Sequence, residues 1–88
     1  EFYCAKRQRA LLRLGVQDAT KVWLNDRQVF EDAQHRPYKQ VEIFRLPVTL
    51  RQGRNALLVK VSKILGEFQF SLDFESSPGE PVALLWWH

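Results

Sequence analysis

The sequence predicts an all-β fold, an antiparallel β-sandwich assembled from short strands. Apolar and polar residues alternate in most segments. In residues 68–74 every even position is apolar and every odd position is polar, the period-two pattern of a half-buried strand. Turn-forming residues separate these segments, and no window has the spacing of an amphipathic helix. Because each strand has only one apolar face, a second apolar sheet must cover that face, as in a sandwich.

The first predicted strand has an apolar face formed by Ala10, Leu12 and Leu14, opposite Arg9 and Arg13. The second ends at Leu24 and turns back through Asn25 and Asp26 into residues 28–30. Asn and Asp tolerate positive φ angles better than other non-glycine residues, so this pair suits the two-residue turn of a β-hairpin.

A long loop and three further strands follow the hairpin. Residues 31–38 are polar, contain a proline and show no period, which predicts a loop. The strand at residues 44–50 has its apolar face at the even positions, and Pro47, which cannot donate a hydrogen bond, indicates an edge strand or a bulge. A glycine turn leads into the strand at residues 57–61, and residues 68–74 form the last strand.

The composition is that of one small globular domain or part of one. The chain has 88 residues, of which 45% are hydrophobic and 26% are charged. It contains no apolar run of about 18 residues that could span a bilayer, and its first residues lack a signal-peptide pattern. Its single cysteine, Cys4, cannot form an internal disulfide, so the redox compartment stays open.

The character of the sequence changes near its end. We expect residues 1–75 to form the sandwich and residues 76–88 to form a linker and an apolar tail. The aromatic-rich tail must be buried as a final strand, in a following domain or against a partner. The predicted partner-binding residues are Leu84, Leu85, Trp86 and Trp87.

Four motifs follow one another along the chain: Leu12-Arg13-Leu14-Gly15 before an Asp-containing loop, Val22-Trp23-Leu24-Asn25, Val48-Thr49-Leu50, and a Gly53-Arg54-Asn55 turn before residues 57–61. This series resembles the galactose-binding-like jelly roll, found in the sugar-binding domain of family 2 glycoside hydrolases and in accessory domains of bacterial extracytoplasmic proteins. The resemblance covers residues 10–74. It implies the C-terminal portion of such a domain, with the opening strands supplied upstream or by another chain, and it favours an extracytoplasmic or secreted location.

Two departures from the family pattern bear on metal binding and on the hairpin. The chain reads Gly-Val-Gln-Asp-Ala at residues 15–19, where relatives tend to have an additional acidic residue, and Asn25-Asp26 where they tend to have Asn-Gly. A structural calcium ion could draw on the carboxylates of Asp18, Glu31 and Asp32. Because calcium takes about six to eight oxygen ligands, three scattered carboxylates are too few, and we predict no cofactor.

The loops and one aromatic side chain are the candidate ligand site. Trp23 could offer its indole face to a sugar ring, or it could cover the sheet face. The residues of the long loop could form a polar binding rim, or a solvated connector. We expect the loops around Asp18, Asn25 and residues 35–38 to face any ligand. The predicted ligand-binding residues are Asp18, Trp23, Asn25, His35, Arg36 and Tyr38.

The net charge of +3 raises the question of an anionic ligand. Binding to phosphates would require the arginines to converge on one surface, with aromatic residues between them. The prominent arginines are Arg7, Arg9, Arg13, Arg51 and Arg54. They alternate with apolar residues or lie at turns, and acidic residues are interspersed. We therefore expect a solvated outer sheet face and no nucleic-acid partner.

Catalytic machinery is not evident in the sequence. No serine has a histidine at a spacing that indicates a nucleophile and its base, and a Cys4 and His35 pair has no support from spacing. Asp73 and Glu75 are two positions apart on a predicted strand, about 6.5 to 7 Å, but any strand with polar outer residues has such a pair. We predict that the chain is not an enzyme.

Two functions fit these observations. The first is a non-catalytic accessory module that binds carbohydrate weakly through a shallow surface. The second is a structural or protein-interaction module that docks neighbouring domains or subunits without recognising a sugar. The incomplete sandwich and the apolar tail favour the second function, and the family resemblance favours the first.

Overall fold

The computed structural model describes residues 1–37, 40–62, 70–77, 80–81 and 86–87. All regular elements in this part of the chain are β-strands, and three antiparallel sheets pack together, which confirms the predicted all-β, sandwich-like fold. None of the described residues belongs to a helix that could cross a membrane. The molecule measures 40 × 26 × 20 Å along its principal axes.

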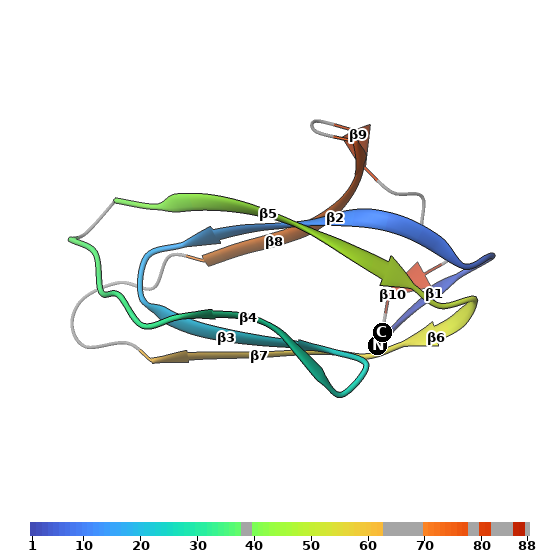
Figure 1. Cartoon of the computed structure of the whole chain (residues 1–88), viewed down its shortest axis with the longest axis horizontal. Helices are drawn as coiled ribbons and strands as arrows, with labels where there is room; N and C mark the ends of the chain where they lie inside the picture. Colours follow the sequence, from blue (N-terminus) through green and yellow to red (C-terminus); the bar gives the residue numbers. More distant parts are fainter. Residues whose placement is uncertain (38–39, 63–69, 78–79, 82–85, 88) are drawn as a thin grey trace.

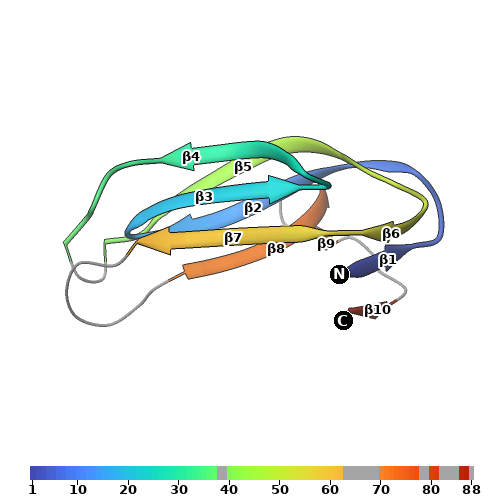
Figure 2. The ribbon, with the colours of Figure 1, turned by 90° about the horizontal axis from the view of Figure 1, so that it is seen from below.

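The ten strands, in chain order, are β1 (Phe2–Cys4), β2 (Gln8–Val16), β3 (Ala19–Leu24), β4 (Arg27–Asp32), β5 (Glu42–Leu50), β6 (Gly53–Asn55), β7 (Leu57–Ser62), β8 (Phe70–Ser77), β9 (Glu80–Pro81) and β10 (Trp86–Trp87). The sheets have the strand orders β5-β2-β8-β9, β4-β3-β7 and β10-β1-β6. In Figure 1 the first sheet forms the upper layer and the second forms the lower layer. Only Ala56 separates β6 from β7, so the third, smaller sheet continues the lower layer at one end (Figure 2).

The alternation in the sequence decides which side chains lie between the layers. In β2, Leu12, Leu14 and Val16 are fully buried, and in β3 Val22 is fully buried as well. Leu57 and Phe70 pack against this core from β7 and β8. Burying such side chains is worth about 1.5 to 3 kcal/mol each, so the apolar faces of the two layers hold the sandwich together.

Two aromatic contacts reinforce the core. The ring centroids of Phe2 and Phe74 are 4.9 Å apart, and those of Phe30 and Phe44 are also 4.9 Å apart. Phe30 lies in β4 and Phe44 in β5, which are the edge strands of the two layers on the same side of the molecule. The edge position predicted for the strand that contains Pro47 is therefore confirmed.

The β3–β4 hairpin has the predicted turn. Asn25 and Asp26 have φ angles of 52° and 68°, and positive φ at both central residues defines a type I′ turn. Its twist matches the right-handed twist of the flanking strands. This turn places Trp23 and Arg27 on either side of one tight bend.

The structure contains four strands that the alternation did not predict, namely β1, β6, β9 and β10. Each has only two or three residues, too few to display a period. The predicted linker and tail at residues 76–88 include the end of β8, β9 and β10, and β10 pairs with β1 through Phe2↔Trp87 and Tyr3↔Trp86. The backbone of two predicted partner-binding residues is thus paired within the chain. Leu84 and Leu85 lie outside the described residues, as do residues 68–69 of the last predicted strand.

A buried asparagine joins the hairpin to the turn that precedes β7. The side chain of Asn55 is fully buried. Its Oδ1 accepts hydrogen bonds from the backbone N of Arg51 (2.9 Å) and from Nδ2 of Asn25 (3.0 Å), and its Nδ2 donates to the carbonyl oxygens of Arg51 (3.0 Å) and Gly53 (3.3 Å). Asn25 is held in addition by its Oδ1, which accepts from the backbone N of Ala56 at 2.8 Å. These bonds fix two turns against each other.

Replacing Asn55 with alanine should lower the free energy of unfolding by about 2 kcal/mol, because the substitution leaves partly buried backbone groups of Arg51 and Gly53 without partners. Gln52→Ala, an exposed polar truncation in the same turn, is the control and should change it by less than about 0.5 kcal/mol. Urea denaturation of both variants tests this. Equal stability of the two variants would contradict the role given to Asn55.

Asp26→Gly should stabilise the chain by about 0.5 kcal/mol, because glycine adopts positive φ without strain and the Asn-Gly pair is favoured in type I′ turns. In contrast, Gln28 lies in β4, where no positive φ is needed. Gln28→Gly should therefore destabilise the chain by about 0.5 to 1 kcal/mol. Thermal denaturation measures both changes, and a lower midpoint for Asp26→Gly would refute the strain argument.

Candidate functional site

The predicted ligand-binding residues that the structure describes do not lie on one surface. Asp18 directly precedes β3, whereas Asn25 directly follows it. Six strand residues span about 20 Å, so the two loops lie at opposite ends of the sandwich (Figure 1). Of the loops expected to face a ligand, those around Asp18 and residues 35–37 therefore lie at one end of the sandwich, and the turn at Asn25 lies at the other end.

At the first end, Asp18 closes the long loop against the sandwich. Its side chain is only 6% exposed, and its Oδ1 lies 3.2 Å from Nδ1 of His35. The hydroxyl of Thr20 donates to the carbonyl oxygen of Asp18 at 2.8 Å, and the backbone N of Arg36 donates to that of Gln17 at 3.0 Å. Through these contacts the buried Asp18 holds the loop in place. One third of the His35 side chain remains exposed.

Arg36 also points into the protein. Its Nη2 lies 2.7 Å from Oδ2 of Asp32 and 2.5 Å from Oε2 of Glu42, and its guanidinium carbon lies 5.9 Å from the ring centroid of Phe44. Desolvation alone would lower the pKa of Arg36, but the hydrogen bonds and charges of the two carboxylates raise it above its ordinary value. With its side chain 12% exposed, Arg36 supports the loop and contributes little to an outer rim.

The carboxylates suggested for calcium have separate partners. Glu31 forms an ion pair with Lys21 at 3.3 Å, Asp32 pairs with Arg36, and Asp18 contacts His35. Within the described ranges, no three His, Cys, Asp or Glu side chains converge as a metal site would require. Tyr38, the remaining predicted residue of the loop, lies outside the described residues.

The other side chains considered as catalytic groups are held in ion pairs or are buried. Asp73 and Glu75 form ion pairs with Arg13 (4.0 Å) and Arg45 (2.9 Å). Cys4 is 1% exposed, and its burial raises the pKa of the thiol, which disfavours the reactive thiolate.

At the second end, Asn25 has a structural role, whereas Trp23 faces outward. The amide of Asn25 is bonded to Asn55 and Ala56, as described above. Trp23 is half-buried on the outer face of β3, opposite Leu58 of β7, whose exposed fraction is 63%. With Asp26, Trp23 and Leu58 border a hollow of about 200 Å³.

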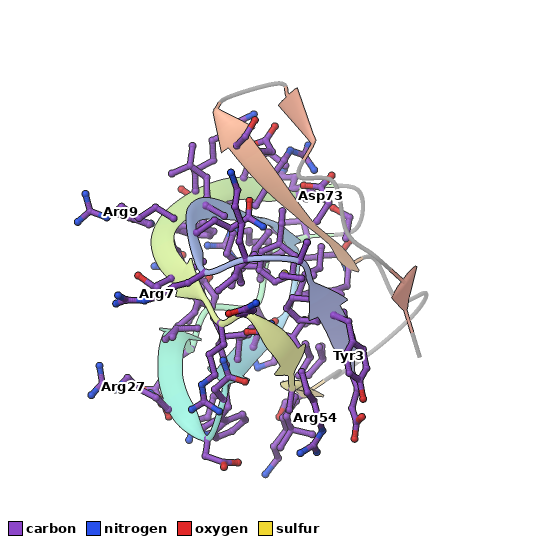
Figure 3. All side chains as sticks on the ribbon, turned by 90° about the vertical axis from the view of Figure 1, so that its right-hand side faces the viewer. Tyr3, Arg7, Arg9, Arg27, Arg54 and Asp73 are labelled. Carbon is purple, nitrogen blue, oxygen red and sulfur yellow. The ribbon has the colours of Figure 1, made fainter. Side chains whose placement is uncertain are left out.

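A concavity larger than the hollow at Trp23 was not predicted from the sequence. It is an open groove of about 890 Å³ that contains four arginines: Arg7, Arg9, Arg27 and Arg51. It is bordered by the start of β2, the end of β5 and the β3–β4 turn, and in Figure 3 Arg7, Arg9 and Arg27 project along one side of the molecule. Three of these arginines were noted in the sequence, but their convergence depends on strands that are distant in the chain.

Comparisons with protein-family models, with curated proteins and with solved structures found no match. The resemblance to the galactose-binding-like jelly roll therefore stays a prediction from the motifs.

Arg36→Ala should lower the free energy of unfolding by about 2 kcal/mol, because the mostly buried carboxylate of Asp32 loses its counterion. The double variant Arg36→Ala, Asp32→Ala should lose less than the sum of the two single variants. Lys21→Ala removes a half-exposed ion pair and is the control, with an expected loss of under about 0.5 kcal/mol. Additive effects of Arg36 and Asp32 in chemical denaturation would show that their contact is not structural.

Proposed function

We propose that this chain is a non-catalytic accessory module that binds carbohydrate on the outer face of the β4-β3-β7 sheet. The observation that carries the proposal is the outward position of Trp23 beside an exposed Leu58 and a shallow hollow. An indole face packs well against the C–H bonds of a sugar ring.

The neighbours of Trp23 supply polar groups for sugar hydroxyls. Gln28 of β4 is its cross-strand partner and is exposed, and Asp26 lies at the rim of the hollow. A flat strip with one aromatic ring and a few polar groups holds a ligand weakly, because it encloses little of the ligand surface.

The alternative is an interaction module without sugar recognition. The exposed Leu58 beside Trp23 favours it, because an apolar spot on a sheet face also suits a protein partner. The pairing of β10 with β1 weakens the case for the tail as the docking segment, since its strand already has a partner within the chain. Both functions would therefore use the same outer face of the β4-β3-β7 sheet.

Trp23→Ala should weaken the binding of a neutral oligosaccharide about tenfold, because the stacking surface is lost. Trp23→Phe keeps a smaller ring and should lose less. Gln52→Ala, an exposed side chain outside this sheet, is the control. Calorimetric titration of ligands selected on a glycan array measures the affinities. If no glycan binds, and Leu58→Asp abolishes concentration-dependent association of the chain, the interaction module is the correct function.

A further inference from the structure

The arginine groove is a second surface, and it goes beyond the carbohydrate face at Trp23. We propose that the groove binds an anionic polysaccharide, whose sulfate or carboxylate groups pair with Arg7, Arg9, Arg27 and Arg51. This inference does not depend on the role of Trp23, because the groove lies on the other side of the β3–β4 turn and shares no lining residue with the hollow at Trp23.

The four arginines have no carboxylate partner among the described residues. By contrast, a carboxylate lies within 4.0 Å of a guanidinium nitrogen of each of four arginines elsewhere: Arg13, Arg36, Arg45 and Arg54. None of the described residues that line the groove is acidic. Arginines grouped without counterions attract anions to the groove and lose no internal ion pair when they bind one.

The backbone holds these arginines in place. Arg9 pairs with Thr49 in the β2–β5 ladder, and Arg51 directly follows the end of β5. Asn55 clamps both the N–H and the carbonyl of Arg51, and the type I′ turn positions Arg27 at the start of β4. Guanidinium groups carried by fixed strands and turns leave less backbone entropy to lose on binding.

The lining suits a sugar chain that carries oxyanions. A guanidinium presents planar N–H groups that pair with two oxygens of a sulfate or carboxylate at once. Between the arginines the groove has apolar side chains, including Leu11, Val29 and Val48, against which the C–H faces of sugar rings can pack. Its volume of about 890 Å³ exceeds what a single small anion fills and accommodates several linked sugar units.

Other polyanions fit less well. Single-stranded nucleic acid is usually held by aromatic platforms, and no described residue of the lining is aromatic. Duplex DNA is read by elements that protrude into its grooves, whereas this surface is concave. An acidic peptide added as a strand along β5, the edge strand of its sheet among the described residues, would meet Pro47, which has no N–H to donate.

The test measures affinity of the full 88-residue chain for three oligosaccharides of equal length: heparin, de-sulfated heparin that keeps its carboxylates, and neutral dextran. We expect heparin to bind with an affinity that falls steeply with salt, and dextran not to bind in the groove. Binding of de-sulfated heparin would show that carboxylates suffice, and its absence would assign the groove to sulfates.

The deciding variant is Arg7→Gln, Arg9→Gln, Arg27→Gln, which removes three exposed charges. If each contact contributes about two- to fivefold, the variant should bind heparin about eightfold to about 125-fold more weakly and with a smaller salt dependence. The matched control, Arg13→Gln, Arg54→Gln, Lys60→Gln, loses the same charge outside the groove and should bind almost as the parent chain does. Thermal denaturation checks that both triple variants are folded. The single substitution Arg9→Glu is a second, milder variant and should also weaken heparin binding.

Three results would overturn the proposal. The groove variant and the control could bind heparin equally, which would show that heparin affinity depends only on the net charge of the chain. Dextran could bind in the groove as well as heparin does. Oligo-dT could bind more tightly than heparin and lose its affinity in the groove variant, which would make the ligand a nucleic acid. The carbohydrate face is tested separately by Trp23→Ala with neutral sugars, so either proposal can fail alone.

Discussion

The contact between the side chains of Asn25 and Asn55 is the constraint on which the surface of this protein depends. The two amides meet at 3.0 Å, and Asn55 has no exposed surface. A buried amide with several partners is costly to move, because any displacement leaves polar groups unpaired. The β3–β4 hairpin and the turn after β5 are therefore held as one unit, and this unit places Trp23, Arg27 and Arg51.

The two ends of the sandwich differ in how their charged side chains are paired. At the end that contains Asp18, the charged groups meet one another, and Arg36 is shared by Asp32 and Glu42. Such contacts tie a loop to the core and leave little charge for a ligand. At the other end, four arginines have no carboxylate partner among the described residues. Both proposed binding surfaces therefore flank the hairpin end, away from the loop that the sequence indicated.

Much of the fold could be predicted because local rules specify it. Alternation identified β2, β3, β5, β7 and β8 to within a few residues, and the Asn25-Asp26 pair identified the type I′ turn. The strands β1, β6, β9 and β10 could not be found in this way, because two or three residues carry no period and form a strand only where a neighbour supplies the ladder. The candidate site was predicted less well, since a polar loop with His35 and Arg36 has the same composition whether it faces solvent or folds back onto Asp18 and Glu42.

Local patterns in the sequence specify which side chains point inward and where the chain reverses, because the two-residue period of a strand and the φ angles of a turn are local properties. Which distant residues meet depends on how the strands pair and pack. Arg9 and Arg51 come together through the β2–β5 register, and Asp18 and Asn25 are separated by the length of β3. Strand pairing depends on hydrogen bonds and packing between segments far apart in the chain, and no local pattern encodes that choice.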